Sequence, residues 1–463
     1  MTKRSHDDMN SLRNCQEITS LHSAVRSGSL NAVRNFIQTG VSVDSLDDTG
    51  VTPLLLAVLT NQPECVKLLL TTCADVNFST REHGTGLHIA CSHGNLQIVN
   101  YLLLAGADSS LCGPDKQTCL HLAAAGGHLD VLKSLVYNKT SVNVSDRNGV
   151  TPLHLSVMND HEEVTLFLID NGALVNKQDV KGNLPLHYAV KQSNIEIIKT
   201  LIAQGCDKDR KNYNEEAPIC TAVRIGHVQT LLLLVKLGCR TDIRQTDGST
   251  TIHTLVSTYN SKYPTYFRTV LEMLLYGGCD INSRAYSTLE TPLYRAISLT
   301  KSECAEVLLA YGADPNISSP FDITALRLAY MRQLSQTCVF MLHCGMTWNR
   351  ESWIKSLPSI HSSEPNTVLE KCKHWRTQPS SLLNICRIAF RKHYGKDLHR
   401  MLVKRVDMPC AIKNFFLLND LKRQKYNSFL ESFGGGSWVN SLLDEEIEYG
   451  PFKRRKNDIP DIC

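Results

Sequence analysis

The sequence lacks the features that mark several large classes of protein. It has no run of about 18 apolar residues, the length that a membrane-spanning helix needs. Its first residues, MTKRSHDDMNSLRNC, have no apolar core, so we expect no secretion signal there. The net charge is only +4, which predicts no general attraction to nucleic acid. We therefore expect a cytoplasmic location, or also a nuclear one, with neither membrane nor nucleic acid as a partner.

Motifs of catalysis and metal binding are also absent. The sequence contains no phosphate-binding P-loop and no G-x-S-x-G nucleophile motif. Its 17 cysteines include no C-x-x-C pair, so the spacing of a structural zinc site is missing. In the absence of an export signal, we interpret these cysteines as reduced and mostly buried. We expect no enzymatic activity, no cofactor and no metal.

What the sequence does contain is one unit repeated about ten times. Segments of the type T-P-L-H-x-A begin at Thr19, Thr52, Thr85, Thr118, Thr151, Leu184, Ala217, Thr250, Thr291 and Thr324. Every step between them is 33 residues except the step from Thr250 to Thr291, which is 41. Such a period indicates a repeat architecture in which each unit buries its apolar face against its neighbours.

Each part of the unit predicts a local structure. The first Thr can cap a helix, and a following Pro such as Pro53 suits the first helical position. In LHLAAAGGHLDVLKSLV, two short apolar helices are separated by a turn at Gly126 and Gly127. The segments DDTG, DRNG and DVKG predict turns at the tips of projecting fingers. Glycine ends most units, but Cys73 and Lys139 replace it, so we expect those helix exits to be less regular.

The combination of period, T-P-L-H start and G-A-D-x-N turn resembles the ankyrin repeat over residues 17–345. The resemblance implies an all-α solenoid of helix-turn-helix repeats with β-hairpin fingers, preceded by an arm at 1–16. The histidine of the motif is then a hydrogen-bonding scaffold residue and not a catalytic or metal-binding one. The residues concerned are His22, His88, His121, His154, His187 and His253.

Finger tips and first-helix positions line the concave side of such arrays, and their mixed charge favours a protein partner over nucleic acid. The candidate target-binding residues are Asp115, Lys116, Arg147, Asn148, Lys181, Tyr213 and Tyr263. Tyr263 belongs to an insertion around 258–267, where we expect Pro264 to break any helix. Two interpretations stay open for this segment: a tolerated surface insertion, or an adaptable contact loop rich in aromatic residues.

A different pattern follows the repeats. The segment SSLLNICRIAFRKHYG, residues 380–395, predicts a short helix with Leu382, Cys386 and Phe390 on one apolar face. The segment DMPCAIKNFFLLND follows at 407–420. Together they resemble a SOCS box: Ser381, Leu382 and Cys386 match its first half, and Pro409 matches its second half. Asp407 stands where that family has its first proline. The whole chain resembles the ankyrin-repeat and SOCS-box family.

This resemblance implies a non-catalytic substrate receptor of a ubiquitin ligase. The first half of the box is implied to bind elongin C, itself bound to elongin B, through Ser381, Leu382, Ile385, Cys386 and Phe390. The second half is implied to recruit cullin-5 and its RING partner through Val406, Met408, Pro409, Ile412 and Phe415.

The alternative is an ankyrin scaffold without a ligase role, in which 380–420 forms a helical cap on the last repeat. Residues 346–379 are expected to be a connector and 421–463 a flexible tail.

Overall fold

The computed structural model describes residues 21–138, 140–259, 264–317, 319, 323–344 and 346. The chain divides into two compact units, Met1–Thr230 and Leu231–Cys463, each of which is described by itself. The expected N-terminal arm and everything after Met346, including the SOCS-box-like segment, lie outside the described residues.

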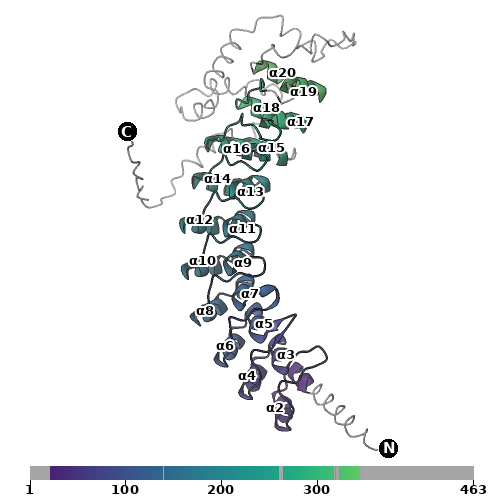
Figure 1. Ribbon diagram of the computed structural model, residues 1–463, viewed down its shortest axis with the longest axis vertical. Coiled ribbons are helices and arrows are strands. Elements are labelled where there is room, and N and C mark those ends of the chain that lie inside the picture. The colour runs from purple at the N-terminus through teal and green to yellow at the C-terminus, as the bar shows by residue number, and fades with distance from the viewer. Residues whose placement is uncertain are drawn as a thin grey trace, which may run out of the picture. The chain divides into compact units, whose positions relative to one another are not determined.

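The first unit is a stack of paired helices arranged in two layers (Figure 1). After helical residues 21–26, one layer holds α3 (Pro53–Leu59), α5 (Gly86–His93), α7 (Cys119–Gly126), α9 (Pro152–Met158), α11 (Pro185–Gln192) and α13 (Pro218–Ile225). The other layer holds α2 (Leu30–Gln38), α4 (Pro63–Thr71), α6 (Leu96–Leu104), α8 (Leu129–Tyr137), α10 (Glu162–Asp170) and α12 (Ile195–Ala203). Within each layer every helix packs on the next.

The boundary between the two units falls within α14 (Val228–Lys236). In the second unit α15 (Thr251–Thr258), α17 (Pro292–Ser298) and α19 (Ala325–Met331) pack in series. Their partners are α16 (Pro264–Tyr276), α18 (Ser302–Ala310) and α20 (Ser335–His343). Among the described residues, no helix combines the length and the apolar character that crossing a membrane requires.

The starts of the first-layer helices are built as the motif predicts. The Thr52 hydroxyl accepts a hydrogen bond from the Leu55 N–H at 3.2 Å, and Pro53 occupies the first turn. Thr291 and Pro292 repeat this arrangement in the second unit. Such a cap contributes about 1 kcal/mol, while proline removes a donor that would have had no helical partner.

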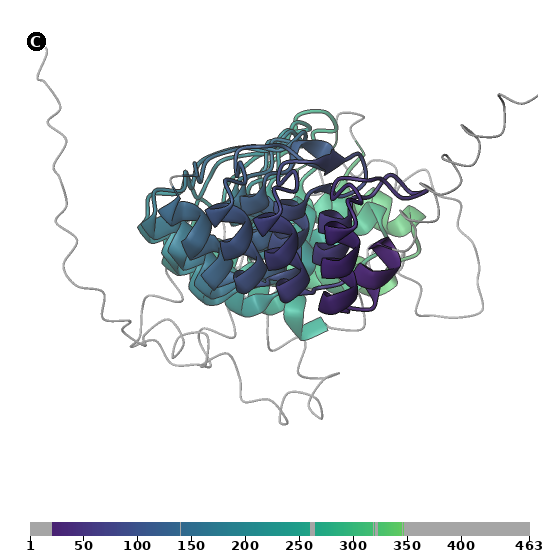
Figure 2. The ribbon, with the colours of Figure 1, turned by 90° about the horizontal axis from the view of Figure 1, so that it is seen from below.

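The finger loops of the first unit lie together on one side of its helices (Figure 2). The second finger is a short hairpin in which β1 (Ser79–Thr80) pairs antiparallel with β2 (Gly84–Thr85). The other described fingers contain no named strands and are hydrogen-bonded turns. Asp146 Oδ1, for example, accepts from the N–H groups of Asn148 and Val150 at 2.8 and 2.9 Å. In this finger the carboxylate of Asp146, and not the expected pairing of two strands, accepts the backbone N–H groups and holds the turn.

Cys73 shows that a helix exit can be regular without glycine. Its φ is 63°, in the same left-handed region as Gly40 at 88°. The Ala74 N–H donates to the Leu69 carbonyl at 3.3 Å, as the Val41 N–H does to Phe36 at 3.2 Å. The expectation of a less regular exit was therefore wrong at Cys73. A left-handed conformation costs a residue with a Cβ atom about 1–2 kcal/mol, and packing between the repeats compensates for that cost here. Lys139 lies outside the described residues.

The described part of the insertion is helical and partly buried. Helix α16 begins at Pro264 and has 13 residues, compared with nine in α18. The expected helix break was wrong, because proline at the first helical position needs no N–H partner. Phe267 is only 1% exposed, and its ring meets Tyr259 edge to face at 5.5 Å between centroids. The extra length therefore adds to the core, while 260–263 lie outside the described residues.

Lys301 of the following repeat anchors the end of α15. Its ammonium donates to the carbonyls of Val256, Ser257 and Tyr259 at 2.9, 2.9 and 3.1 Å. These three bonds use all three donors of the ammonium, and a positive charge suits the C-terminal end of a helix. The segment after α15 is therefore tied to the next repeat.

We predict that Phe267→Ala destabilises the second unit by about 3–5 kcal/mol, the usual cost of removing a fully buried ring. Denaturant unfolding of the full chain measures this loss. Met331→Ala, at a side chain that is 63% exposed, is the matched control and should change stability by no more than about 0.5 kcal/mol. Equal unfolding curves for the two variants would mean that the insertion is not part of the core.

Candidate functional site

The candidate target-binding residues of the first unit lie on the tips of four successive fingers. We call this set the finger-tip surface; all of its members are exposed, and they are Asp115, Lys116, Arg147, Asn148, Lys181 and Tyr213. Tyr263, also predicted, lies outside the described residues.

Backbone hydrogen bonds hold the tips of these fingers in register. The Arg147 N–H donates to the Asp115 carbonyl at 2.9 Å, and the Tyr213 N–H donates to the Lys181 carbonyl at 3.0 Å. Between them, the Val180 N–H donates to the Asn148 carbonyl at 2.9 Å. The finger-tip surface is thus positioned by main-chain contacts that do not depend on the identity of its side chains.

The charges on this surface are accessible to a partner. Arg147 lies 3.6 Å from Asp115, but both side chains are mostly exposed, so the pair contributes at most about 1 kcal/mol. Lys116 and Lys181 have no ion pair within the described ranges. Lys116, Arg147 and Lys181 could therefore pair with acidic groups of a partner without first breaking a strong ion pair within this chain.

An apolar patch lies beside these cations. Tyr213 is 70% exposed and Val180 is 56% exposed. The Tyr213 ring covers Gly182, where a Cβ atom would stand only 2.8 Å from Tyr213 Cδ1. Exposed aromatic and aliphatic groups among charges are typical of protein-binding surfaces. The sequence analysis identified Tyr213 but missed Val180. The position of Val180 inside the DVKG turn could have indicated that its side chain is exposed.

The histidines of the motif link neighbouring repeats. In most of them Nδ1 accepts the N–H of the residue that caps the same helix, as His121 does from Thr118 at 3.1 Å. Nε2 meets a carbonyl of the following finger: His22 with Val51 at 2.9 Å, His121 with Val150 at 3.0 Å, His154 with Asn183 at 3.3 Å, His187 with Glu216 at 3.2 Å and His253 with Glu290 at 3.0 Å. The predicted scaffold role is confirmed for these five side chains.

Burial keeps several of these rings neutral. It lowers the pKa of His121, His154 and His187, and it lowers the pKa of His253 to about 4. A neutral ring can accept on one nitrogen and donate on the other, which the link between repeats requires.

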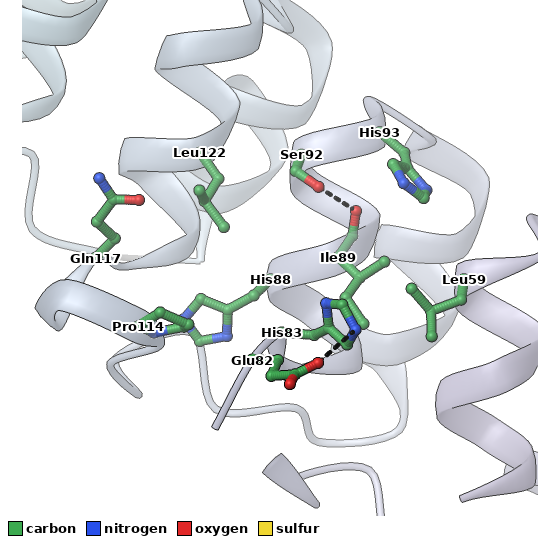
Figure 3. A pocket seen from close by; sticks show the side chains of 10 residues that line it. All are labelled: Leu59, Glu82, His83, His88, Ile89, Ser92, His93, Pro114, Gln117 and Leu122. Carbon is green, nitrogen blue, oxygen red and sulfur yellow. Dashed lines mark hydrogen bonds and ion pairs between the residues drawn. The ribbon is translucent and has the colours of Figure 1, made fainter. Parts of the chain in front are cut away.

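A pocket of about 400 Å³ lies over α5 and α7, beside the second and third fingers (Figure 3). Its polar lining includes His83, His88, His93, Gln117 and the carboxylate of Glu82. Glu82 and His83 form an exposed pair at 4.0 Å. Sequence reasoning placed His88 with the scaffold histidines and did not find this pocket.

Two buried thiols lie close to His88. A hydrogen bond with Cys91, helped by His88, lowers the pKa of Cys119 to about 6 although burial acts in the opposite direction. No group of three or more His, Cys, Asp or Glu side chains in the described ranges is placed to hold a metal ion. The described cysteines are free, and all except Cys73 and Cys112 are buried.

The repeats also match a known family. The family model described as "Ankyrin repeats (3 copies)" matches residues 2–82, 87–179, 120–212, 171–247 and 219–319. The chain belongs to the ankyrin-repeat family. The predicted ankyrin-repeat solenoid fold is confirmed, and no catalytic family is indicated.

Individual relatives match shorter stretches. Protein phosphatase 1 regulatory subunit 27 of Mus musculus is 42% identical over 71 residues, which is 15% of this chain and 46% of that protein. Ankyrin repeat and SOCS box protein 5 of Bos taurus is 32% identical over 130 residues, 27% of this chain and 38% of that protein. The chain thus spans less than half the length of these two relatives.

A solved structure, the human ASB11 ankyrin repeat domain, is 31% identical to this ankyrin-repeat chain. It covers 46% of this chain and 96% of its own, with a TM-score of 0.42.

The low pKa of His253 predicts acid sensitivity. Above pH 6.5 both folded and unfolded His253 are neutral; below it, the unfolded chain binds a proton that the folded ring accepts only near pH 4. When the pH falls from 7 to 5, the preference of His253 for the neutral form should therefore lower the free energy of unfolding by about 2 kcal/mol.

His253→Gln should remove that part of the pH dependence, whatever its effect on stability at pH 7. Urea unfolding at both pH values measures the difference. An unchanged pH dependence in this variant would contradict the assignment of a neutral, buried ring.

Proposed function

We propose that this chain is the non-catalytic substrate receptor of a cullin-RING ubiquitin ligase. Its ankyrin repeats form an array of the kind that binds other proteins. The observation that carries the ligase role is the SOCS-box-like pattern of residues 380–420, directly after the repeats. The 32% identity with Ankyrin repeat and SOCS box protein 5 over 130 residues supports it.

The first half of the box is suited to dock on elongin C, which pairs with elongin B. Leu382 and Cys386 are four residues apart, so they share one face of a helix, together with Ile385 and Phe390. Ser381 can cap the start of that helix. A short amphipathic helix that has no core of its own gains most by placing its apolar face in a partner's groove. These residues lie outside the described part of the chain.

The second half would direct the complex to cullin-5 and its RING partner. The contact residues proposed for this step are Val406, Met408, Pro409, Ile412 and Phe415. Asp407 stands in the place of a family proline, so this half departs further from the pattern than the elongin half does. The ligase role then needs no catalytic group on this chain, because holding a target beside the transfer enzyme raises its effective concentration.

The finger-tip surface is the proposed site for the target protein. It combines Lys116 and Lys181, which have no ion pair within the described ranges, with the exposed apolar patch of Val180 and Tyr213. Because backbone hydrogen bonds hold the fingers in register, the side chains of the finger tips can differ without any change in the core. A receptor for an intracellular ligase would work in the cytoplasm or nucleus.

Reversing two charges tests the target site. Arg147→Glu with Lys181→Glu should weaken a target, first identified by co-purification, at least tenfold, because both cations face the partner. Arg34→Glu with Lys67→Glu, on the exposed side of α2 and α4, is the matched control and should bind as the parent does. Affinity is measured by titration calorimetry, and melting checks that both variants stay folded. Parental affinity in the finger-tip variant would place the target elsewhere.

Truncation of the docking helix tests the ligase role. Leu382→Ala and Cys386→Ala should each cost about 2 kcal/mol, a roughly thirtyfold loss of affinity for the elongin B–elongin C pair. Arg387→Ala and Lys392→Ala, off the apolar face, should leave that affinity unchanged. The melting of the ankyrin array should not change in any of these variants. Loss of array stability without any elongin binding would favour the scaffold alternative with a helical cap.

A further inference from the structure

Three successive fingers of the first unit each carry an exposed cation at the tip. Lys116 lies on the third finger, Arg147 on the fourth and Lys181 on the fifth. Arg147 has a weak partner in the exposed Asp115, 3.6 Å away, and the two lysines have no ion pair within the described ranges. These tips therefore present a row of positive charges to the solvent.

Two carboxylates that stand close to this row in the sequence are already engaged inside the fingers. Asp146 Oδ1 accepts two backbone N–H groups of its own finger, at 2.8 and 2.9 Å. Asp179 Oδ1 likewise accepts two N–H groups of its own finger, both at 2.8 Å. Both side chains are buried. A carboxylate held in this way fixes its own turn and does not turn outward to pair with Arg147 or Lys181.

The spacing of the row follows from the packing of the repeats. Helices that pack side by side in one layer lie about 8–10 Å apart, so equivalent points on successive fingers are about 10 Å apart. The fingers lie together on one side of the helices (Figure 2), and backbone bonds such as Arg147 N–H to the Asp115 carbonyl keep their register. An extended chain advances about 3.3 Å per residue, so it passes one finger with every three residues.

An apolar patch adjoins one end of the row. Val180 precedes Lys181 on the fifth finger, and the Tyr213 N–H of the sixth finger donates to the Lys181 carbonyl at 3.0 Å. The side chains of Val180 and Tyr213 are both more than half exposed. An exposed aromatic side chain whose backbone is held in place is a good anchor for an apolar group of a partner.

We propose that the finger-tip surface binds an extended acidic segment of the target protein, with a carboxylate at every third residue and an apolar side chain at one end. The proposal rests on the protein-binding function proposed above and names the chemistry of the partner. The carboxylates pair with Lys116, Arg147 and Lys181 in turn. The apolar side chain packs on Val180 and Tyr213.

A single-stranded nucleic acid is the other polyanion that a row of cations attracts, but the observations favour a peptide. Asp115 stands within the row and repels a continuous phosphate backbone, whereas a peptide can place its charges only where the cations are. Single-strand binding sites also stack successive bases on aromatic side chains, and Tyr213 is the one aromatic member of the finger-tip surface.

Two synthetic peptides test the proposal on the full chain at pH 7. In the first, Glu-Ser-Thr is repeated three times and followed by Leu. In the second the order of residues is reversed, because charge alone does not set the chain direction. The control peptide has the same composition, with its Glu residues adjacent to one another. The anisotropy of a dye on each peptide measures binding.

One of the two spaced peptides should bind at least fivefold more tightly than the control, because only the spaced carboxylates meet a cation on each finger. Equal affinity for all three peptides, or no binding of any, would overturn the proposal. An oligonucleotide of four thymidines, whose three phosphates carry the same charge, should bind at least fivefold more weakly than the tighter spaced peptide. Equal or tighter binding of the oligonucleotide would show that the row recognises nucleic acid instead.

Variants locate the contact. Arg147→Gln with Lys181→Gln should weaken the tighter spaced peptide at least fivefold, and Tyr213→Ala should weaken it to a similar extent. Arg34→Gln with Lys67→Gln, on the exposed side of α2 and α4, is the matched control and should bind the peptide as the parent does. Melting checks that each variant stays folded. Parental affinity in either finger-tip variant would contradict the assigned contacts.

The outcome separates the chemistry of the partner from the proposed function. If no peptide binds but the reversal of charge at Arg147 and Lys181 still weakens the target, only the acidic-segment proposal fails. If the spaced peptide binds at the finger tips and the charge reversal has no effect on the target, the assignment of the target site fails.

Discussion

No repeat of this chain can bury its own apolar face, so each depends on the next for both core and hydrogen bonds. The side chains of Leu120, Leu132 and Leu135 are fully buried between neighbouring helix pairs. At five of the described steps, a link from a motif histidine to a carbonyl of the following finger adds a polar contact, as between His121 and Val150. Because contacts run mainly between neighbours, the stack is set by repeated local rules.

That constraint leaves the finger tips free to carry function. Their backbones are held in register by bonds such as Arg147 N–H to the Asp115 carbonyl, which impose nothing on the side chains. Charge and apolar area can therefore change from one finger to the next without loss of the core.

The period and the capping residues were enough to predict the fold, because Thr52 and Pro53 act within one helical turn. The prediction that Pro264 breaks a helix was wrong, because a proline can also start one. Which of the two occurs here depends on the tertiary packing of Phe267, and the local sequence does not contain that information. The contact of His88 with the Cys119 thiol could not be foreseen from a motif that His88 matches. The exposed finger tips were predicted, but which of them bind a target depends on a partner that the sequence does not contain.

The central claim is that this ankyrin-repeat chain brings a target to a ubiquitin ligase. The most direct test mixes the purified full chain with purified elongin B–elongin C and cullin-5, and measures the mass of the assembly by light scattering after size-exclusion chromatography. We predict a stable complex with one copy of each subunit, in which cullin-5 joins only when the elongins are present. Separate elution of this chain from the elongin pair at micromolar concentration would contradict the claim.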